Sequence, residues 1–288
     1  IWDRDEMSLF IDLGTNGEIV FGNRDFLVSC ACSAGPAFEG GDISCGMRAT
    51  DGAIEACTID KNTMEPTLTL VGDPGQRCVG ICGSGIIDII SELFRCGMIN
   101  AKGLFVKEGD RIRRDHHGMG RYVLAEASES ETEREISINE VDIDNFIRAK
   151  GAIFSAIRTM LKSLDFDISM IEEVYVAGGI GSGINMQNAV KIGMFPDIPI
   201  EYYHYIGNSS LCGAYAMLLS TKAEKKVYEL AQNMTYLELS TEPGYMDEFV
   251  ACCFLPHTDS SLFPTVLPYP SAVRSLPPAS APCHCRTP

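Results

Sequence analysis

The stretch Phe10-Ile11-Asp12-Leu13-Gly14-Thr15-Asn16-Gly17-Glu18 joins the end of an apolar strand to a glycine-rich turn. Backbone N–H groups of such a turn can point into one concavity and bind phosphate oxygens, because glycine permits the backbone angles that this requires. Thr15 and Asn16 add side-chain donors, and Asp12 is placed to hold a hydrated Mg²⁺ ion or to orient a water molecule. Asn16-Gly17 is also typical of a plain type I′ hairpin, so this stretch alone leaves a structural turn open as the alternative.

A second and a third glycine turn follow further along the chain. Val174-Tyr175-Val176-Ala177 leads into Gly178-Gly179-Ile180-Gly181-Ser182-Gly183, an arrangement in which α/β folds bind nucleotides. A dinucleotide fingerprint beginning at Gly179 would need glycine where Ile184 stands, so a generic nucleotide-facing turn or tight strand–helix packing is indicated. In Gly83-Ser84-Gly85 we expect Ser84 to cap a helix whose N-terminus favours an anion, and a capped structural helix is the favoured interpretation.

The pattern of apolar residues and turn residues around these stretches predicts an α/β protein. Turns rich in Asn, Gly and Asp separate three short strands at 8–13, 18–21 and 26–31, which indicates a meander. Residues 33–46 predict a loop with a short helical turn, and residues 104–138 a polar segment with strand-like patches such as 122–125. The remaining predicted strands are 53–59, 67–71, 172–177 and 200–206, and the predicted helices are 86–96, 143–164, one from about 185, 209–220, 222–233 and 245–254.

The composition excludes several classes of partner. The chain of 288 residues carries 39 acidic and 23 basic residues, a formal net charge of −16, so we expect neither nucleic acid nor a membrane surface as partner. No apolar run has the length of a membrane span, and no signal peptide opens the chain. Because the first residue is Ile1, we expect a piece of a longer protein, and residues 267–288, rich in Pro, Ser and Ala, are expected to form a disordered tail.

The chemistry-bearing side chains favour phosphate chemistry over other reactions. The twelve cysteines show no C-x-x-C pair and lie mostly in apolar stretches, so we expect buried, reduced thiols in a cytoplasmic protein. The five histidines show no helical pairing and indicate no metal site, and no Ser lies in a G-x-S-x-G elbow. The carboxylates nearest to the turns are Asp12, Glu18, Glu39 and Asp42, with Glu39 interpreted as a solvated surface group; this set suits Mg²⁺-assisted phosphate chemistry better than acyl transfer.

Several motifs resemble those of one ATPase superfamily. Ile11-Asp12-Leu13-Gly14-Thr15 resembles the second phosphate motif of the acetate and sugar kinase, heat-shock chaperone and actin (ASKHA) superfamily, and Val176-Ala177-Gly178-Gly179-Ile180 resembles its adenosine motif. More closely, residues 7 to 266 resemble the C-terminal domain of reductive activators of corrinoid proteins. The runs that carry this resemblance are residues 11–19, 34–40, 81–85, 177–181, 207–214 and 254–259.

The resemblance implies an actin-like, ribonuclease H-like α/β fold over residues 1–266, with a mixed sheet and flanking helices, as part of a two-lobed ATPase domain. Together with the turns described above, it gives a set of expected site residues. Asp12 and Glu18 are the expected catalytic carboxylates, and Asp12 is expected to hold Mg²⁺ through water. The residues expected to contact ATP are Gly14, Thr15, Asn16, Gly17, Gly83, Ser84, Gly85, Gly178, Gly179 and Gly181.

The function that the resemblance implies is ATP-dependent electron transfer. In that family a [2Fe–2S] domain supplies the electron, and the acceptor is cob(II)alamin on a corrinoid protein of a methyltransferase system, which becomes cob(I)alamin. These 288 residues lack the superfamily's first phosphate motif and a ferredoxin-like cysteine cluster, so we expect [2Fe–2S] only in an N-terminal part and ATPase activity only in the intact parent protein. A small-molecule kinase of the same fold and a non-catalytic corrinoid-binding or partner-binding half-domain are the alternatives. The oligomeric state is open, with a homodimer among the options.

Overall fold

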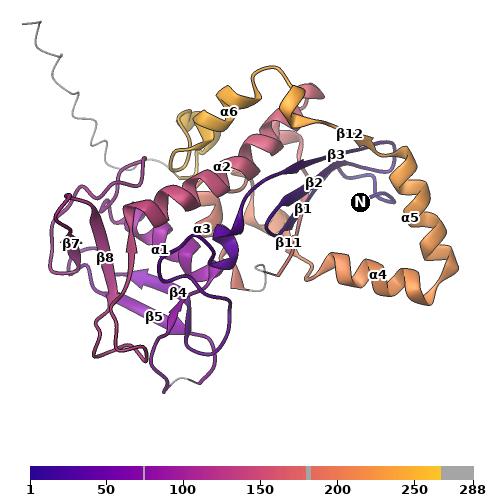
Figure 1. Cartoon of the computed structure of the whole chain (residues 1–288). Helices are drawn as coiled ribbons and strands as arrows, with labels where there is room; N and C mark the ends of the chain where they lie inside the picture. Colours follow the sequence, from indigo (N-terminus) through magenta and orange to yellow (C-terminus); the bar gives the residue numbers. More distant parts are fainter. Residues whose placement is uncertain (74, 180–182, 267–288) are drawn as a thin grey trace, which may run out of the picture.

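The computed structural model describes residues 1–73, 75–179 and 183–266, and a mixed sheet with helices packed beside it forms its centre (Figure 1). Strands β1 (Ser8–Leu13), β2 (Gly17–Gly22) and β3 (Leu27–Cys32) form the expected antiparallel meander. On the other side of β1, β10 (Glu173–Ala177) and β11 (Tyr203–Tyr205) run parallel to it, giving the order β11-β10-β1-β2-β3. Three antiparallel strands followed by two parallel ones confirm the predicted ribonuclease H-like class.

The alternation of residues along β1 fixes which face of the sheet is core. Leu9, Ile11 and Leu13 are buried on the face that α2 (Glu140–Ser163) covers, and α6 (Tyr245–Cys252) packs along α2. Since side chains alternate along a strand, Phe10 and Asp12 point to the opposite face, where both are half-buried. Asp12 therefore lies at the end of a firmly anchored strand.

Helix α2 begins at Glu140, three residues before the start predicted from its apolar stripe. The Asn139 side chain accepts from the N–H groups of Val141 and Asp142, and the Asp142 carboxylate accepts from the Asn139 N–H at 3.0 Å. This capping box satisfies N–H groups that the first helical turn leaves without partners, so the helix starts at polar residues that an apolar stripe does not mark.

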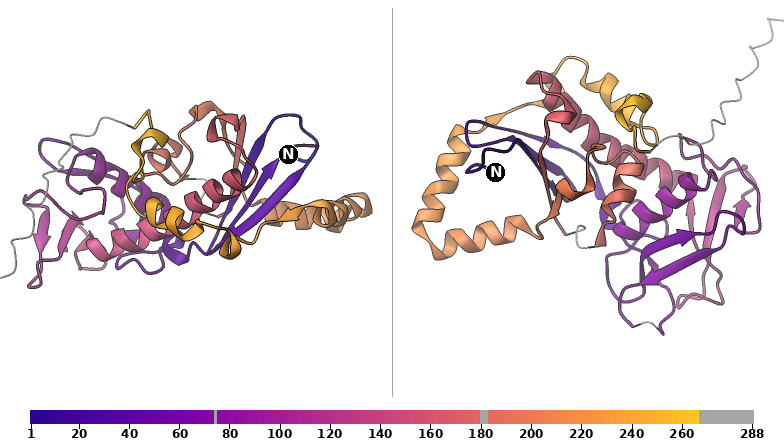
Figure 2. Two further views of the ribbon diagram at one scale, coloured as in Figure 1. Left: turned by 90° about the horizontal axis from the view of Figure 1, so that it is seen from above. Right: turned by 180° about the vertical axis from the view of Figure 1, so that it is seen from behind.

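Residues 33–139 form an insert between β3 and α2, and it lies at the opposite end of the molecule from α4 and α5 (Figure 2). One of its sheets has α1 packed on it, and the other is a meander in the region where the sequence predicted only strand-like patches. The elements of the insert are β4 (Ala53–Ile59), β5 (Pro66–Leu70), β6 (Gly80–Ile81), α1 (Gly83–Arg95), β7 (Ile112–Arg114), β8 (Gly120–Ala125) and β9 (Ile136–Asn139).

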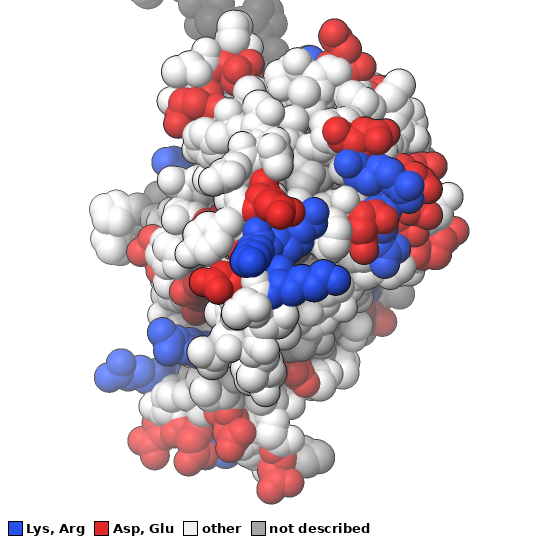
Figure 3. All heavy atoms as spheres, turned by 90° about the vertical axis from the view of Figure 1, so that its right-hand side faces the viewer, with Lys and Arg blue, Asp and Glu red and all other residues white. Residues whose placement is uncertain are grey.

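After α3 (Met186–Lys191) and β11, two helices extend away from the body of the molecule (Figure 1). These are α4 (Ser209–Leu219) and α5 (Thr221–Asn233), and every residue of both is exposed or half-buried. The N-terminus lies between them and the sheet, where Lys226 Nζ is 4.7 Å from the centre of the Trp2 ring. Figure 3 shows this side of the molecule, on which basic and acidic side chains are mixed. A short strand, β12 (Thr235–Tyr236), returns the chain to β3.

The predicted strand 200–206 is wrong in its first half. Residues Ile200–Tyr202 form a 3₁₀ turn, and only Tyr203–Tyr205 pair with β10. The Tyr202 N–H donates to the Pro199 carbonyl at 3.0 Å, so the segment after Pro199 closes on itself before it reaches the sheet.

Three further expectations concern the whole chain. The ten cysteines that the structure describes are unpaired, and seven of them are buried, which confirms the expected burial of most thiols. Within the described residues, no helix combines the length and apolar character needed to cross a membrane. The predicted tail, residues 267–288, lies outside the described residues.

Candidate functional site

Asp12 stands where three segments meet. β1 and β10 are parallel neighbours, with Asp12 opposite Ala177, so both strands end at the same edge of the sheet. Helix α4 begins at that edge, and the hydroxyls of Ser209 and Ser210 donate to Asp12 Oδ2 at 2.9 and 3.0 Å. Among the described residues, Asp12 Oδ1 has no hydrogen-bond partner, which leaves one carboxylate oxygen for a hydrated cation.

The turn after β1 is not the plain type I′ hairpin that the sequence left open. Leu13 pairs with Gly17, so the turn has three residues, 14–16, and Gly17 belongs to β2. A type I′ turn needs two central residues with positive φ, and residues 14–17 are not among the positive-φ positions of the described chain. The Thr15 hydroxyl donates to Glu39 Oε1 at 3.3 Å, which ties this turn to the segment that follows β3.

The turn after β10 uses its first two glycines differently. Gly178 has φ +110°, and a Cβ there would lie 2.1 Å from the Leu13 carbonyl oxygen, so only glycine fits beside β1. A Cβ on Gly179 would meet no described atom within 4 Å, and this residue is exposed. Gly178 therefore serves close packing, whereas Gly179 borders open space. Gly181 lies outside the described residues.

The expectation that Ser84 caps α1 is wrong. The helix begins at Gly83, its N-cap is Cys82, and Ser84 lies inside the first turn with its hydroxyl 3.4 Å from Cys82 Sγ. Gly85 packs against β4, since a Cβ there would lie 2.1 Å from the Ile54 carbonyl oxygen. The N-terminus of this 13-residue helix nevertheless points toward the other two turns. It presents the positive end of the helix dipole and N–H groups that have no intrahelical partner.

All three glycine turns line one cavity of about 590 Å³. Six of the expected site residues lie in its wall: Asp12, Gly14, Gly83, Ser84, Gly178 and Gly179. The other described ones, Thr15, Asn16, Gly17, Glu18 and Gly85, lie outside it. Glu18 is exposed on β2, directly opposite Asp12, and Gly17 is buried against Cys32, whose Sγ would lie 2.9 Å from a Cβ at that position.

Several residues of the cavity wall were missed by the sequence reasoning. Ser210 and Asn208 come from the start of α4, and their signal was the Asn-Ser-Ser cap sequence directly after a strand. Arg48 is the one basic residue of the wall among those described, and no motif marked it. Glu39, interpreted as a surface carboxylate, is exposed and also borders the cavity.

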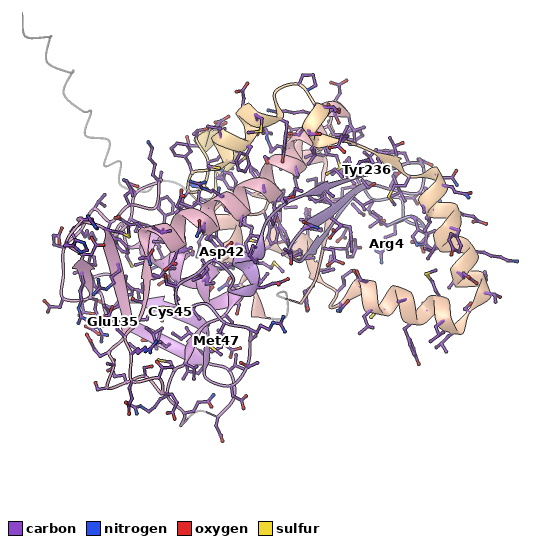
Figure 4. All side chains as sticks on the ribbon, in the orientation of Figure 1. Arg4, Asp42, Cys45, Met47, Glu135 and Tyr236 are labelled. Carbon is purple, nitrogen blue, oxygen red and sulfur yellow. The ribbon has the colours of Figure 1, made fainter. Side chains whose placement is uncertain are left out.

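Figure 4 labels Asp42, Cys45 and Met47 on the segment that follows β3. Met47 lines the cavity, whereas Asp42 is held beside α2, where its carbonyl accepts from Asn145 Nδ2 at 2.9 Å. Asp42 is therefore a structural residue of this segment and does not border the site.

One group of potential metal ligands lies elsewhere. Glu248, Cys252 and His257 place one ligand atom each within 4.8 Å of the others, although the sequence indicated no metal site at the histidines. The residues do not fit a metal ion. The Glu248 carboxylate already accepts from Arg158 and Lys162. His257 Nδ1 accepts from the Asp259 N–H at 2.9 Å, so in the neutral ring Nε2 carries the proton.

The [2Fe–2S] group of the resembling family requires four thiolate ligands. Within the described residues, one group of three or more His, Cys, Asp or Glu side chains has its ligand atoms within 4.8 Å of one another, and it contains a single cysteine. This group, with its single cysteine, does not supply the four thiolates of a [2Fe–2S] centre.

The strand order and the three turns around one cavity define the ASKHA class of nucleotide-binding folds. A family profile described as the C-terminal domain of RACo, the ASKHA domain, matches residues 6–267. The chain belongs to this family.

Individual relatives agree with this assignment. A solved structure of a reductive activator for a corrinoid, iron–sulfur protein superposes with a TM-score of 0.85 at 51% identity, covering 91% of this chain and 42% of that one. The corrinoid activation enzyme RamQ of Eubacterium limosum is 34% identical over 256 residues, and a reductase of the Co(II) methylated amine-specific corrinoid protein of Methanosarcina barkeri is 26% identical over 268. They are longer proteins: the matches take in 85% and 86% of this chain but only 42% and 45% of their lengths.

Proposed function

We propose that this chain is the nucleotide-binding part of an ATP-dependent reductive activator of a corrinoid protein. The observation that carries the proposal is the meeting of three glycine turns and a carboxylate at one cavity. The names of the relatives favour corrinoid activation over the kinase alternative.

Different residues of the cavity wall are proposed to bind the phosphates and the adenosine part of ATP. In this proposal the N–H groups of the α1 N-terminus, beside Gly14 of the first turn, face the phosphates, and the Arg48 guanidinium adds a positive charge. The open wall at Gly179 receives the adenosine part.

The carboxylate of Asp12 has a separate role. The Ser209 and Ser210 hydroxyls fix its orientation through Oδ2, and Oδ1 would hold a hydrated Mg²⁺. The metal would neutralise phosphate charge and orient the attacking water.

The nucleotide then acts through conformation. α4 begins at Ser209, whose hydroxyl donates to Asp12, and extends away from the sheet, so a change at the phosphates can shift this helix. A nucleotide shifts the population of two states only as far as its affinity for them differs. One electron, supplied from an iron–sulfur group outside these residues, would reduce Co(II) of the corrinoid to Co(I).

The test follows the corrinoid by absorption spectroscopy. The intact parent protein with its iron–sulfur part, a corrinoid protein in the Co(II) state and a chemical electron donor are mixed with and without MgATP. We expect the Co(I) spectrum to form only with MgATP. Formation at the same rate without nucleotide would contradict the proposal, and conversion of ATP with a phosphorylated small molecule as product would favour a kinase.

A further inference from the structure

A buried polar contact joins α1, which carries part of the cavity wall, to α3, which follows the wall residue Gly183. Asn188 of α3 donates from Nδ2 to Asp88 Oδ1 of α1 at 2.7 Å, and each residue is 6% exposed. The pair links the insert, which contains α1, to the part of the chain that follows β10. It lies outside the cavity itself, so it contacts no ligand there.

The position of the pair relates directly to the cavity. Asp88 lies four residues after Ser84, hence on the same face of α1 and one turn further from the cavity. On the other side, Asn188 lies five residues after Gly183, a wall residue whose Cβ position would be 3.0 Å from Ser84 Oγ. The two walls thus touch at Ser84 and Gly183, and the Asp88–Asn188 hydrogen bond is the next polar connection behind that contact.

Both side chains have further partners that fix their orientation. Asp88 Oδ2 accepts from the Cys57 N–H of β4 at 3.4 Å, and Asn188 Oδ1 accepts from Lys191 Nζ at 3.1 Å. Desolvation raises the pKa of Asp88, while the hydrogen bonds from Asn188 and Cys57 oppose that rise. A carboxylate is costly to bury, and a hydrophobic pair could fill the same space. The hydrogen-bonded pair therefore fixes the orientation of α1 relative to α3 in addition to filling the space between them.

We propose that Asp88 and Asn188 are positioning residues, which hold the α1 N-terminus and the wall after β10 at the separation that the nucleotide requires. The inference rests on the proposed function, since it concerns the geometry of the same cavity. Neither residue acts on the nucleotide directly; both act through Ser84, Gly83 and Gly183.

Exchange of the two side chains offers a sharp test. In Asp88→Asn the new amide cannot accept from both the Cys57 N–H and Asn188 Nδ2, because one of its two polar atoms is a donor. If Asn188 turns over so that its oxygen accepts from the new amide, its NH₂ group faces the Lys191 ammonium instead. One hydrogen bond is lost in either orientation. Asn188→Asp sets two carboxylates against each other. The double variant D88N/N188D restores the set of partners. Its amide on α1 accepts from the Cys57 N–H and donates to its carboxylate on α3, and that carboxylate accepts from Lys191.

The measurement is the Kd of a fluorescent ATP analogue with Mg²⁺, on full chains whose circular dichroism matches the unsubstituted protein. We expect each single variant to bind roughly tenfold more weakly, equivalent to about 1.4 kcal/mol, and the double variant to recover to within about threefold. If D88N does not fold, Asn188→Ala, which leaves Asp88 bound to Cys57, takes its place with the same expectation.

Glu92→Gln is the matched control. Glu92 lies one turn after Asp88 and accepts from the Ile59 N–H at 2.8 Å and from the Arg95 guanidinium. Among the described residues its carboxylate forms no hydrogen bond to α3 and feels only the charge of Lys191, so the substitution disturbs a buried carboxylate of α1 and leaves the Asp88–Asn188 hydrogen bond in place. We expect a lower melting temperature and an unchanged Kd. Unchanged affinity in the folded single variants, or a double variant that regains stability but not affinity, would overturn the inference alone. Absence of nucleotide binding by the unsubstituted protein would overturn the proposed function and the inference with it.

Discussion

Asp12 carries the proposed metal chemistry through one carboxylate oxygen. In Asp12→Asn the amide oxygen can still accept from Ser209 and Ser210, so the fold should be retained, whereas the negative charge that orients hydrated Mg²⁺ is lost. We expect ATP turnover of the intact parent protein to fall roughly a hundredfold with little change in melting temperature. Phosphate release assays and thermal melts measure both, and unchanged turnover would remove Asp12 from the site.

Gly178 and Gly179 are adjacent, yet their substitutions should have opposite effects. Gly179→Val adds a side chain to open space beside the cavity, so we expect native stability and weakened nucleotide binding. Gly178→Ala forces a Cβ against the Leu13 carbonyl at positive φ and should cost about 2 kcal/mol or more in stability. Chemical denaturation and a nucleotide titration separate the two outcomes. Normal ATP affinity in Gly179→Val would contradict the assignment of this wall.

His257 gives the protein a pH dependence away from the site. Burial and the Lys150 ammonium lower its pKa below the ordinary 6.5, while Glu248, 3.8 Å from Nε2, opposes this and Arg158 adds to it. The unfolded chain therefore binds the proton at a higher pH than the folded chain, so stability is lost as the pH falls below 6.5.

The comparison that isolates this effect is His257→Gln. We expect the free energy of unfolding, measured by urea denaturation from mildly acid to neutral pH, to fall less steeply toward acid pH in the variant than in the unsubstituted protein. Parallel curves would show that His257 does not titrate differently in the two states.

At the scale of residues, the sequence predicts what is local. Asp12, Gly14 and the glycines after β10 are found because a strand followed by glycine is a pattern within one segment. The contact of Ser209 and Ser210 with Asp12 cannot be found in this way, because these serines lie far from Asp12 along the chain. They meet Asp12 because β1 pairs in parallel with β10 and α4 begins at the same edge of the sheet. Arg48 likewise belongs to no motif, and its place in the cavity wall depends on the fold of the insert.

At the scale of elements, the N-terminus of α2 offers a test of the capping box. Asn139→Ala removes the acceptor for the Val141 and Asp142 N–H groups and the donor to Ser44 Oγ at 3.0 Å. We expect a loss of about 1 kcal/mol, and at most about 2 kcal/mol, in the free energy of unfolding. Asn139→Asp, which keeps a capping acceptor, is the control and should lose much less. Equal losses in both variants would mean that the cap is not the source of stability.

The ends of several helices and strands could not be predicted from sequence patterns. Apolar periodicity finds α2 but begins it at Ile143, the first buried apolar residue, because the cap and Glu140 are polar and Val141 is exposed. Ser84 satisfies the statistical preference for an N-cap, yet the helix starts at Gly83. Only Cys82, the N-cap, separates the helix from the end of β6. The strand after Pro199 is shortened by a turn that closes on the Pro199 carbonyl, a contact that alternation cannot reveal.

At the scale of the whole molecule, the class of fold follows from the order of elements, but the shape of the site does not. The sequence orders three glycine turns along the chain without stating that they share a cavity. Their meeting depends on the parallel pairing of β1 and β10 and on the insert turning α1 back toward that edge. The exposure of α4 and α5 was also not predicted, since α4 is rich in small and apolar residues.

The central claim is that the three turns bind one nucleotide together, and hydrogen–deuterium exchange with and without MgATP tests it most directly. The account predicts that peptides covering residues 12–17, 83–86 and 178–179 all become protected by MgATP, and that Asp12→Asn weakens protection in all three at once. Protection of only one turn, or none of the three in a protein that binds ATP, would contradict the account.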